Sequence, residues 1–151
     1  MSAFGIEVNE RAIRVFQGAL TKHEALDQLC QAIERAGHVP NSGVLLKAVL
    51  EREAVMSTGI GGGVAIPHVR IEEVRRACIG VGLAREGIDY GTLDNQPVHV
   101  VVLFAMPAGS QKEYLGLLAQ VMGAMKTPKF LTRLLACSDP HEVATLLNAN
   151  P

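Results

Sequence analysis

Tryptophan is absent from the sequence, and aromatic residues make up only 4% of its 151 residues. Proteins that bind single-stranded nucleic acid stack the bases on aromatic side chains, so this scarcity argues against that class. A formal net charge of -1 also gives no broad basic field to attract nucleic acid or an anionic membrane surface. We therefore expect neither nucleic acid nor a membrane surface as a partner.

Cysteine is also scarce, with Cys30, Cys78 and Cys137 far apart in the sequence. They form no CxxC pair and are odd in number, which argues against a zinc site and against a disulfide framework. We expect buried free thiols of the kind found in a reducing cytoplasm, and neither a metal nor another cofactor.

No apolar stretch reaches the roughly 18 to 20 residues that a membrane-spanning helix needs. The first residues also lack the basic start and apolar run of a signal peptide. Hydrophobic residues make up 48% and charged residues 19%, which is typical of a globular protein. We expect a cytoplasmic protein without membrane insertion, in which residues 1–151 form a single domain.

Five segments carry helix signals. Thr21 and Glu24 have capping-box spacing, and apolar residues then recur at three and four positions, which predicts a helix ending near Ala36 before Gly37. Further helices are predicted from Asn41 or Ser42 to about Glu53, from Ser110 to Thr127, over Phe130 to Leu135, and after Asp139-Pro140. The helix that starts near Asn41 is expected to bury Val44, Leu45, Ala48 and Val49.

Four segments indicate strands: Ala12 to Phe16, Val64 to Ile66, Ala77 to Leu83, and Pro97 to Phe104. The last of these is so uniformly apolar that both of its faces should be covered, as in a sheet between helical layers. The predicted fold class is therefore α/β, with a β-sheet flanked by helices on both faces.

The stretch from Ser57 to Arg70, STGIGGGVAIPHVR, holds four glycines, a short apolar strand, a proline and a histidine. Glycines at this density indicate a shaped loop, because glycine adopts positive φ and permits close backbone approach. Pro67 fixes its own φ and restricts the residue before it, so His68 is expected on stiff backbone at the end of the strand.

Nucleotide binding does not fit these glycines. In a dinucleotide fingerprint a third glycine would replace Val64 and a helix would follow, whereas a strand ending in Pro67 is predicted here. A Walker loop would require Gly-Lys-Ser/Thr after the glycines, and this is missing.

His68 is the candidate chemical group. Imidazole titrates near neutrality and its free nitrogen is a good nucleophile, so it can accept and release a phosphoryl group. Such a transfer mainly requires positioning and neutralisation of the oxygens' charge. Arg52, at the end of the helix that leads into the loop, can supply a bidentate guanidinium.

The combination of Arg52, Ser57 to Gly61 (STGIG) and Ala65 to His68 (AIPH) resembles the enzyme IIA domain of the bacterial phosphotransferase system, fructose/mannitol type. The similarity covers roughly Ile13 to Leu147. The segment LDNQPV, starting at Leu93, also resembles the nitrogen-regulatory branch of that family. The resemblance implies a mixed sheet between helical layers, in a single enzyme IIA type-2 domain.

The resemblance also implies roles for residues and partners. His68 would be the phosphoryl acceptor, charged by a histidine phosphocarrier protein, and Arg52 would stabilise the phosphate. The chain would act as a phosphoryl carrier rather than as a free-standing turnover enzyme. The phosphate would pass to an enzyme IIB in the sugar branch, whereas a nitrogen-branch protein regulates protein targets by contact. The remaining motif residues, Thr58, Gly59, Gly61 and Pro67, would support the site.

Two positions depart from the family pattern. Tyr114 stands where the family usually has a second histidine, and tyrosine cannot supply a cation near pH 7. Val69 stands where glycine is common, and a β-branched residue tolerates positive φ poorly and would crowd a donor. These departures keep open an alternative in which the domain regulates partners without carrying phosphate.

Other polar residues have two interpretations each. His99, in the apolar strand, is either a histidine without a role or a spatial replacement for the second histidine. The arginines at positions 70, 75 and 76 form either a solvated segment or a basic rim that receives an acidic partner. Three functions therefore remain: a regulatory phosphocarrier, which the LDNQPV segment and the lack of a visible IIB segment favour, a non-phosphorylated binding module, and a sugar-specific enzyme IIA.

Overall fold

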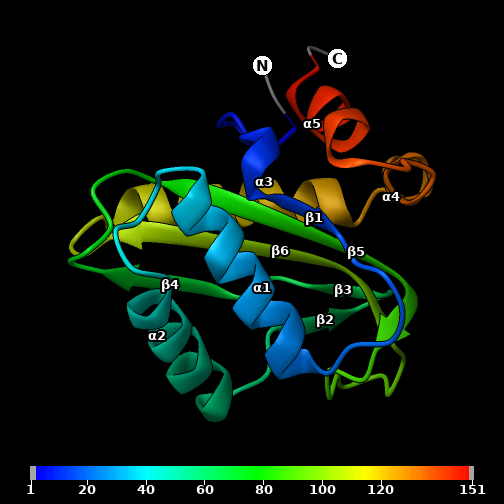
Figure 1. Cartoon of the computed structure of the whole chain (residues 1–151), viewed down its shortest axis with the longest axis horizontal. Coiled ribbons are helices and arrows are strands. Elements are labelled where there is room, and N and C mark those ends of the chain that lie inside the picture. Colours follow the sequence, from blue (N-terminus) through cyan, green and yellow to red (C-terminus); the bar gives the residue numbers. More distant parts are fainter. Residues whose placement is uncertain (1–2, 150–151) are drawn as a thin grey trace.

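The computed structural model describes residues 3 to 149 and contains one mixed sheet between two layers of helices (Figure 1). The helices are the 3-10 helix η1 (Glu10–Ala12), α1 (Lys22–Arg35), α2 (Ser42–Val55), α3 (Gln111–Met125), α4 (Pro128–Leu135) and α5 (Pro140–Asn148). The strands are β1 (Ile13–Val15), β2 (Gly59–Gly61), β3 (Val64–Ala65), β4 (His68–Ile71), β5 (Cys78–Ile88) and β6 (Val98–Pro107). The predicted fold class is thus confirmed.

The long strand β6 is the axis of the sheet. The strand order is β1-β5-β6-β3-β2, and β4 pairs with the same edge of β6 as β3. β5 runs antiparallel to β6, whereas β3 and β4 both run parallel to it. The register places Val64 opposite Val100 and His68 opposite Phe104, so β3 and β4 follow one another along β6 as one interrupted strand.

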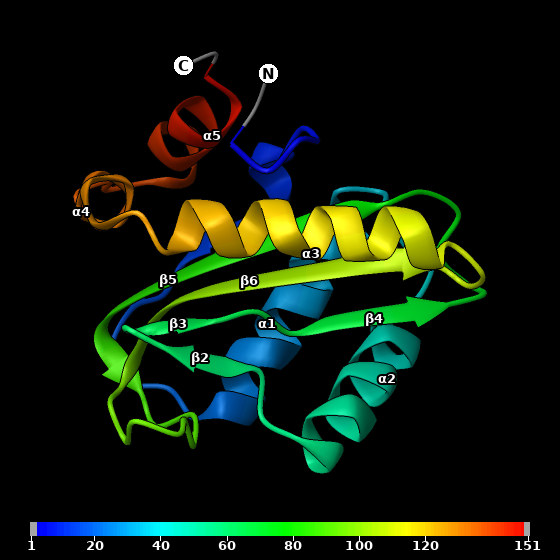
Figure 2. The same cartoon turned by 180° about the vertical axis from the view of Figure 1, so that it is seen from behind.

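Two apolar cores lie on the two faces of the sheet. The first core lies between the sheet and helices α1 and α2, and the second lies between the sheet and α3, α4 and α5. Figures 1 and 2 show the two layers from opposite sides, with α1 and α2 in front in Figure 1 and α3 in front in Figure 2. Almost all of β6 is buried, as its apolar sequence predicts.

Helix boundaries follow the predicted caps closely. Thr21 and Glu24 form the complete capping box of α1, and Asn41 caps α2 through its side-chain oxygen. Asp139 accepts a hydrogen bond from the backbone of Glu142 at the start of α5. These local bonds satisfy backbone amides that have no partner within the first turn of a helix.

One predicted helix face is wrong in part. Val44 is 39% exposed, whereas Leu45, Val49 and Glu53 form the buried face of α2. The reason is that α2 packs mainly against α1 and β4, and only one narrow stripe of the helix is buried. A glutamate therefore occupies a position that periodicity assigns to an apolar residue.

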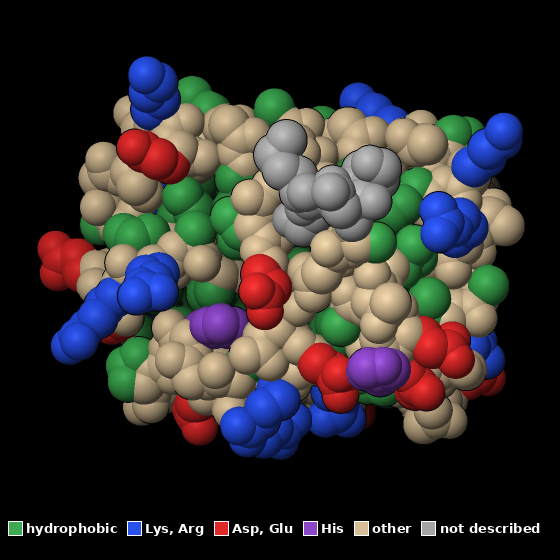
Figure 3. Space-filling model, turned by 90° about the horizontal axis from the view of Figure 1, so that it is seen from above, with side chains coloured by type: hydrophobic (Ala, Val, Ile, Leu, Met, Phe, Trp, Pro, Cys, Tyr) green, Lys and Arg blue, Asp and Glu red, His purple; other side chains and the backbone are tan. Residues whose placement is uncertain are grey.

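The surface carries both signs of charge. Viewed from above in Figure 3, Lys and Arg side chains lie mostly around the margin and alternate with Asp and Glu, with apolar atoms between them. Within residues 3 to 149, no helix has the length and apolar character needed to cross a membrane. The three cysteines are buried and unpaired, as expected.

Candidate functional site

His68 begins strand β4, at a point where the edge strand is interrupted. The backbone amide of Phe104 on β6 donates to the carbonyl oxygen of Pro67, at 3.0 Å, but Pro67 has no amide to return the bond. The sequence predicts that the strand ends at Pro67. It instead resumes at His68 and runs to Ile71, because the β6 edge extends far enough to pair with this segment.

The His68 ring is held in one orientation. Its Nδ1 atom lies 2.6 Å from the carbonyl oxygen of Ile66. A carbonyl oxygen only accepts, so Nδ1 carries the hydrogen and donates it, and Nε2 keeps a free lone pair. The ring stacks on Phe104, with ring centroids 5.1 Å apart, and meets Tyr114 at a tilt, with centroids 5.4 Å apart.

Burial keeps this imidazole neutral. Only 9% of His68 is exposed, and burial lowers its pKa below the ordinary value of 6.5. The hydrogen bond to Ile66 opposes this change, and the positive charge of Arg52 adds to it. A neutral imidazole with a free Nε2 is the nucleophilic form, so the surroundings favour the reactive state near pH 7.

His68 lines a hollow of about 440 Å³. Figure 2 shows β4 between α3 on one side and α2 on the other, and both helices contribute to this hollow. Its lining residues are Ala48, Glu51, Arg52, His68, Val69, Arg70, Ile71 and Tyr114. The structure thus brings three of the sequence-predicted site residues together: His68, Arg52 and Tyr114.

Arg52 lies in the last turn of α2. It is half-buried, and its Nη1 donates to the carbonyl oxygen of Met56, at 3.2 Å. This bond uses one of the five N–H donors of the guanidinium group. The remaining donors leave Arg52 able to bind an oxyanion in the hollow.

A buried polar network supports the loop that follows Arg52. The Glu53 carboxylate accepts from both the hydroxyl and the backbone amide of Thr58, the latter at 3.2 Å. It also pairs with the Lys22 ammonium at 2.8 Å, and the Thr58 hydroxyl lies 3.0 Å from the Tyr90 hydroxyl. Burial, followed by the charge of Glu53, raises the pKa of Tyr90 far above its usual value, so Tyr90 stays protonated.

The sequence pattern did not predict this network, although Thr58 was a predicted site residue. The available signal was Glu53, which continues the stripe formed by Leu45 and Val49 at intervals of four residues. A carboxylate on a buried helix face requires a partner, because an unpaired buried charge is costly. Lys22 and Tyr90 could not have been assigned as those partners, since they lie on distant parts of the chain.

The four glycines of the loop lie in two different environments. Gly59 lies beside Thr58 and packs closely on Thr92: a Cβ added to Gly59 would lie 2.3 Å from the Thr92 Cγ2 atom. Gly61 ends β2, Gly62 and Gly63 form the turn to β3, and all three have positive φ. The Gly62 amide donates to the Asp94 carboxylate, at 3.2 Å.

These three glycines are not among the residues that line the hollow. About 13 Å of extended backbone separates Val64, just after the turn, from His68. Gly61 therefore shapes a hairpin rather than lining the hollow, while Pro67 directly precedes the histidine. The glycines and His68 are close in the sequence, but they lie at opposite ends of the segment that contains β3.

Val69 lines part of the hollow but does not adopt positive φ. Asn95 is the only non-glycine residue with positive φ in the described part of the chain, and Val69 lies in strand β4. Successive strand residues point to opposite faces, so the Val69 side chain packs into the core beneath α1 and α2. Its side chain thus faces away from His68 and the neighbouring Arg70.

Two further sequence hypotheses are settled by position. His99 lies near the start of β6, with its Nδ1 2.9 Å from the carbonyl oxygen of Ala84, and does not replace the second histidine. The three arginines do not form one rim: Arg70 lines the His68 hollow, whereas Arg75 and Arg76 line another. In residues 3 to 149, no group of three or more His, Cys, Asp or Glu side chains is arranged to hold a metal ion.

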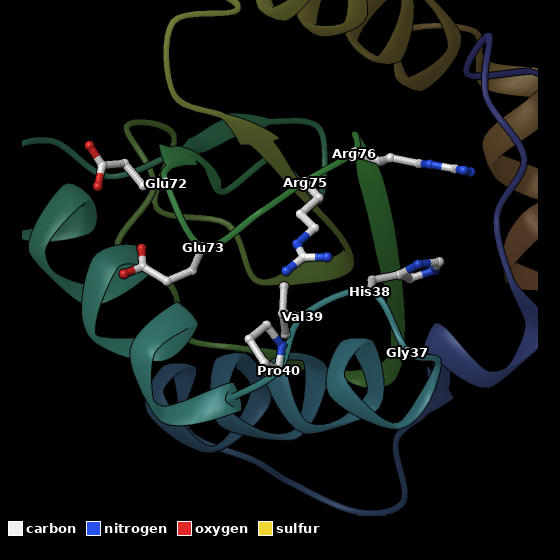
Figure 4. A pocket seen from close by; sticks show the side chains of 8 residues that line it. All are labelled: Gly37, His38, Val39, Pro40, Glu72, Glu73, Arg75 and Arg76. Atoms are coloured by element: carbon white, nitrogen blue, oxygen red, sulfur yellow. The ribbon is translucent and has the colours of Figure 1, made fainter.

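The second hollow, of about 640 Å³, is lined by one histidine, His38, together with two glutamates and two arginines. Figure 4 shows the Arg75 side chain directed toward Val39 and Pro40. Glu73 and Arg76 lie on opposite sides of Arg75, and the Arg76 side chain is directed away from it. Charges of both signs share this surface. The His68 hollow therefore remains the candidate site.

Comparisons with known proteins agree with this fold and place the chain in a family. The profile of the family described as "Phosphoenolpyruvate-dependent sugar phosphotransferase system, EIIA 2" matches residues 8–150. The chain is 31% identical to the nitrogen regulatory protein of Escherichia coli K12 over 128 residues, 84% of this chain and 78% of that protein. It is 29% identical over 127 residues to the Bacillus subtilis fructose-specific EIIABC component, of which it spans only 20%.

A similar fold occurs in the crystal structure of the nitrogen regulatory protein IIA-Ntr from Neisseria meningitidis. The TM-score is 0.85 at 24% identity, covering 93% of this chain and 96% of that one. The Escherichia coli mannitol IIA structure also matches, with a TM-score of 0.78 at 22% identity, covering 94% of this chain and 99% of that one. The profile match over nearly the whole chain shows that the protein belongs to the EIIA type-2 family of the phosphoenolpyruvate-dependent sugar phosphotransferase system.

Proposed function

We propose that this protein carries a phosphoryl group on the Nε2 atom of His68, as a regulatory phosphocarrier of the phosphotransferase system. The observation that carries the proposal is the 2.6 Å contact between His68 Nδ1 and the Ile66 carbonyl oxygen. It fixes the hydrogen on Nδ1 and leaves the Nε2 lone pair free, and Arg52 lines the same hollow as His68.

The proposed donor is a phosphohistidine on a histidine phosphocarrier protein. The Nε2 lone pair attacks phosphorus while the donor's N–P bond breaks, and the bonding pair stays on the donor nitrogen. The hydrogen on Nδ1 remains bonded to Ile66 throughout. Arg52 offsets the charge on the phosphoryl oxygens, and that is the main requirement for this kind of transfer.

The similarity to a nitrogen regulatory protein supports the regulatory branch. The chain covers 78% of the Escherichia coli nitrogen regulatory protein at 31% identity. The LDNQPV segment from Leu93 supports the same branch. In this role the phosphorylation state of His68 would control contact with a protein target.

The test is incubation with enzyme I, the histidine phosphocarrier and phosphoenolpyruvate, followed by intact-protein mass spectrometry. We expect one acid-labile phosphate, absent from His68→Ala. Arg52→Ala should slow the transfer, whereas Arg35→Ala, at the matching last turn of α1, should not. If the wild-type mass does not change, the phosphocarrier proposal is wrong.

A sugar-specific enzyme IIA is the second candidate, supported by the 29% identity to the fructose-specific component of Bacillus subtilis. In that role phosphate would leave His68 for a cysteine of an enzyme IIB. Mixing the phosphorylated protein with IIB domains distinguishes the two, because only the sugar branch predicts rapid loss of phosphate to them. Target binding that is unchanged in His68→Ala would instead support a non-phosphorylated binding module.

A further inference from the structure

Arg70 and His68 lie on the same face of strand β4, because side chains two residues apart in a strand project to the same side. Arg70 is exposed, whereas Val69 between them is buried on the opposite face. The sequence analysis treated Arg70 as part of a solvated or basic segment. In the structure its position relative to His68 is fixed by the strand.

Tyr114 connects these two side chains. The centre of the Arg70 guanidinium lies 4.7 Å from the centroid of the Tyr114 ring, in a cation–π contact. The centroid of the same ring lies 5.4 Å from that of His68, and 5.8 Å from that of Phe104. The ring thus forms a platform that restricts where the guanidinium can lie.

Two arginines therefore approach the His68 hollow from different elements. Arg52 comes from the end of α2 and Arg70 from β4, and both line the hollow together with His68 and Tyr114. One carboxylate, that of Glu51, also lines it. The two guanidinium groups give the hollow a surplus of positive charge and many N–H donors.

We propose that Arg70, held against Tyr114, is the second cation of a two-arginine site that binds a phosphate group in front of His68 Nε2. This inference deepens the proposed phosphocarrier function and, for phosphate attached to His68, rests on it. The site's ligand chemistry is a tetrahedral phosphate, either free or bonded to Nε2. Tyr114 does not contact the phosphate in this arrangement; it positions Arg70.

The arrangement compensates for the missing second histidine. Tyr114 itself brings no positive charge, but its ring holds a side chain that is always charged. A planar guanidinium also binds two phosphate oxygens at once, and a stacked one loses less freedom on binding. The positive charge of the two arginines therefore does not depend on pH near neutrality.

The first arm of the test measures binding of inorganic phosphate, using NMR signals of the His68 ring and of the arginine side chains. We expect Arg70→Ala to weaken phosphate binding about tenfold or more, since a charge-assisted contact is lost. Arg70→Lys should weaken it less. Arg75→Ala, an exposed arginine nearby on the chain that lines the other hollow, is the matched control and should bind like the wild type.

Variants of Tyr114 distinguish a ring that positions Arg70 from a hydroxyl that bonds to the phosphate. Tyr114→Phe keeps the ring and should keep phosphate affinity near that of the wild type, whereas Tyr114→Leu should weaken binding. Combining Tyr114→Leu with Arg70→Ala should add little further loss. Equal affinity in Arg70→Ala and the wild type, or no perturbation of His68 and Arg70 by phosphate in the wild type, would overturn the proposal.

The second arm measures phosphoryl transfer to His68 from the phosphocarrier and the lifetime of the phosphorylated protein. Slower transfer in Arg70→Ala with unchanged Arg75→Ala supports the proposal for covalently bound phosphate. If Arg70→Ala accepts and holds phosphate as the wild type does, the assignment of Arg70 is wrong and the phosphocarrier function stands. If the wild type accepts none but binds free phosphate through Arg70, the phosphocarrier function is wrong and the phosphate site stands.

Discussion

The Lys22 ammonium lies 2.8 Å from the buried Glu53 carboxylate, so the first residue of α1 is paired with the last turn of α2. Through Thr58, the same carboxylate holds the chain that leads from Arg52 toward His68. The buried Glu53 carboxylate thus connects helices α1 and α2 to the loop that leads to His68. The arginine next to it in sequence, Arg52, is one of the two expected to bind phosphate.

Loss of the Glu53 carboxylate should be strongly destabilising. Glu53→Ala leaves the Lys22 ammonium and the Thr58 hydroxyl and amide without their shared acceptor, at a cost of about 3–5 kcal/mol. Glu51→Ala, an exposed glutamate on the same helix, should change the free energy of unfolding by less than about 0.5 kcal/mol. Urea unfolding of the two variants and the wild type measures both values, and similar costs for the two glutamates would contradict the network's role.

The packing of Gly59 against Thr92 predicts a compensating pair of substitutions. Gly59→Ala places a Cβ 2.3 Å from Thr92 Cγ2 and should cost about 1–3 kcal/mol. Thr92→Ser removes that methyl group but keeps the hydroxyl that bonds to Asp94 and Gln96. The double variant should recover part of the loss, as measured by thermal or urea unfolding; strict additivity of the two costs would argue against the close approach.

A control for backbone effects is Gly116→Ala in α3. Gly116 is exposed, and an added Cβ there has nothing within 4 Å. This substitution should stabilise the protein by about 0.5–1 kcal/mol, because glycine is unfavourable inside a helix. If Gly59→Ala lowers the free energy of unfolding and Gly116→Ala raises it, the loss at Gly59 comes from the steric contact with Thr92.

The pKa values of two histidines should move in opposite directions. Burial lowers the pKa of His68 below 6.5, whereas the hydrogen bond to Glu10 raises the pKa of the exposed His141 above 6.5. NMR titration of the imidazole nitrogens measures both values. Glu10→Gln should return only the pKa of His141 toward 6.5, and equal pKa values in the wild type would contradict the burial of His68.

The lowered pKa of His68 also affects stability. Below pH 6.5 the unfolded state binds a proton that the folded state resists, so the contribution of His68 to the free energy of unfolding falls as pH falls from 6.5 toward the folded pKa. Above pH 6.5 this contribution is constant. Phosphoryl acceptance should accordingly persist to a pH somewhat below 6.5, since Nε2 stays unprotonated there.

The three thiols should be unreactive in the folded protein. Burial raises the pKa of Cys30 to about 12 and that of Cys78 to about 11, and it also raises the pKa of Cys137. Thiolate is the reactive form, so a thiol reagent at pH 8 should label them only on unfolding. Rapid labelling of any cysteine in native protein would show that the core around it opens.

The sequence predicted the local features well because each depends on neighbouring residues. The capping box of Thr21 and Glu24, the cap at Asp139 and the apolar character of β6 are all local signals. The pairing of His68 with Arg52 came from spacing and from resemblance. In the structure both residues line the same hollow.

The missed features depend on contacts between distant residues. Strand β4 exists because the β6 edge continues past Pro67, and nothing in HVRI alone indicates this. Arg70 gains its position from Tyr114, 44 positions later in the printed sequence. The buried role of Glu53 similarly depends on Lys22 and Tyr90, which only the fold brings near.

The central claim is that Nε2 of His68 is the phosphoryl acceptor because Nδ1 is held by Ile66. It is tested most directly by ¹⁵N and ³¹P NMR of protein phosphorylated through the phosphocarrier with histidine nitrogens labelled. We expect one N–P bond, on Nε2 of His68, with a hydrogen retained on Nδ1. Phosphate on Nδ1, on another residue, or on none would contradict the account.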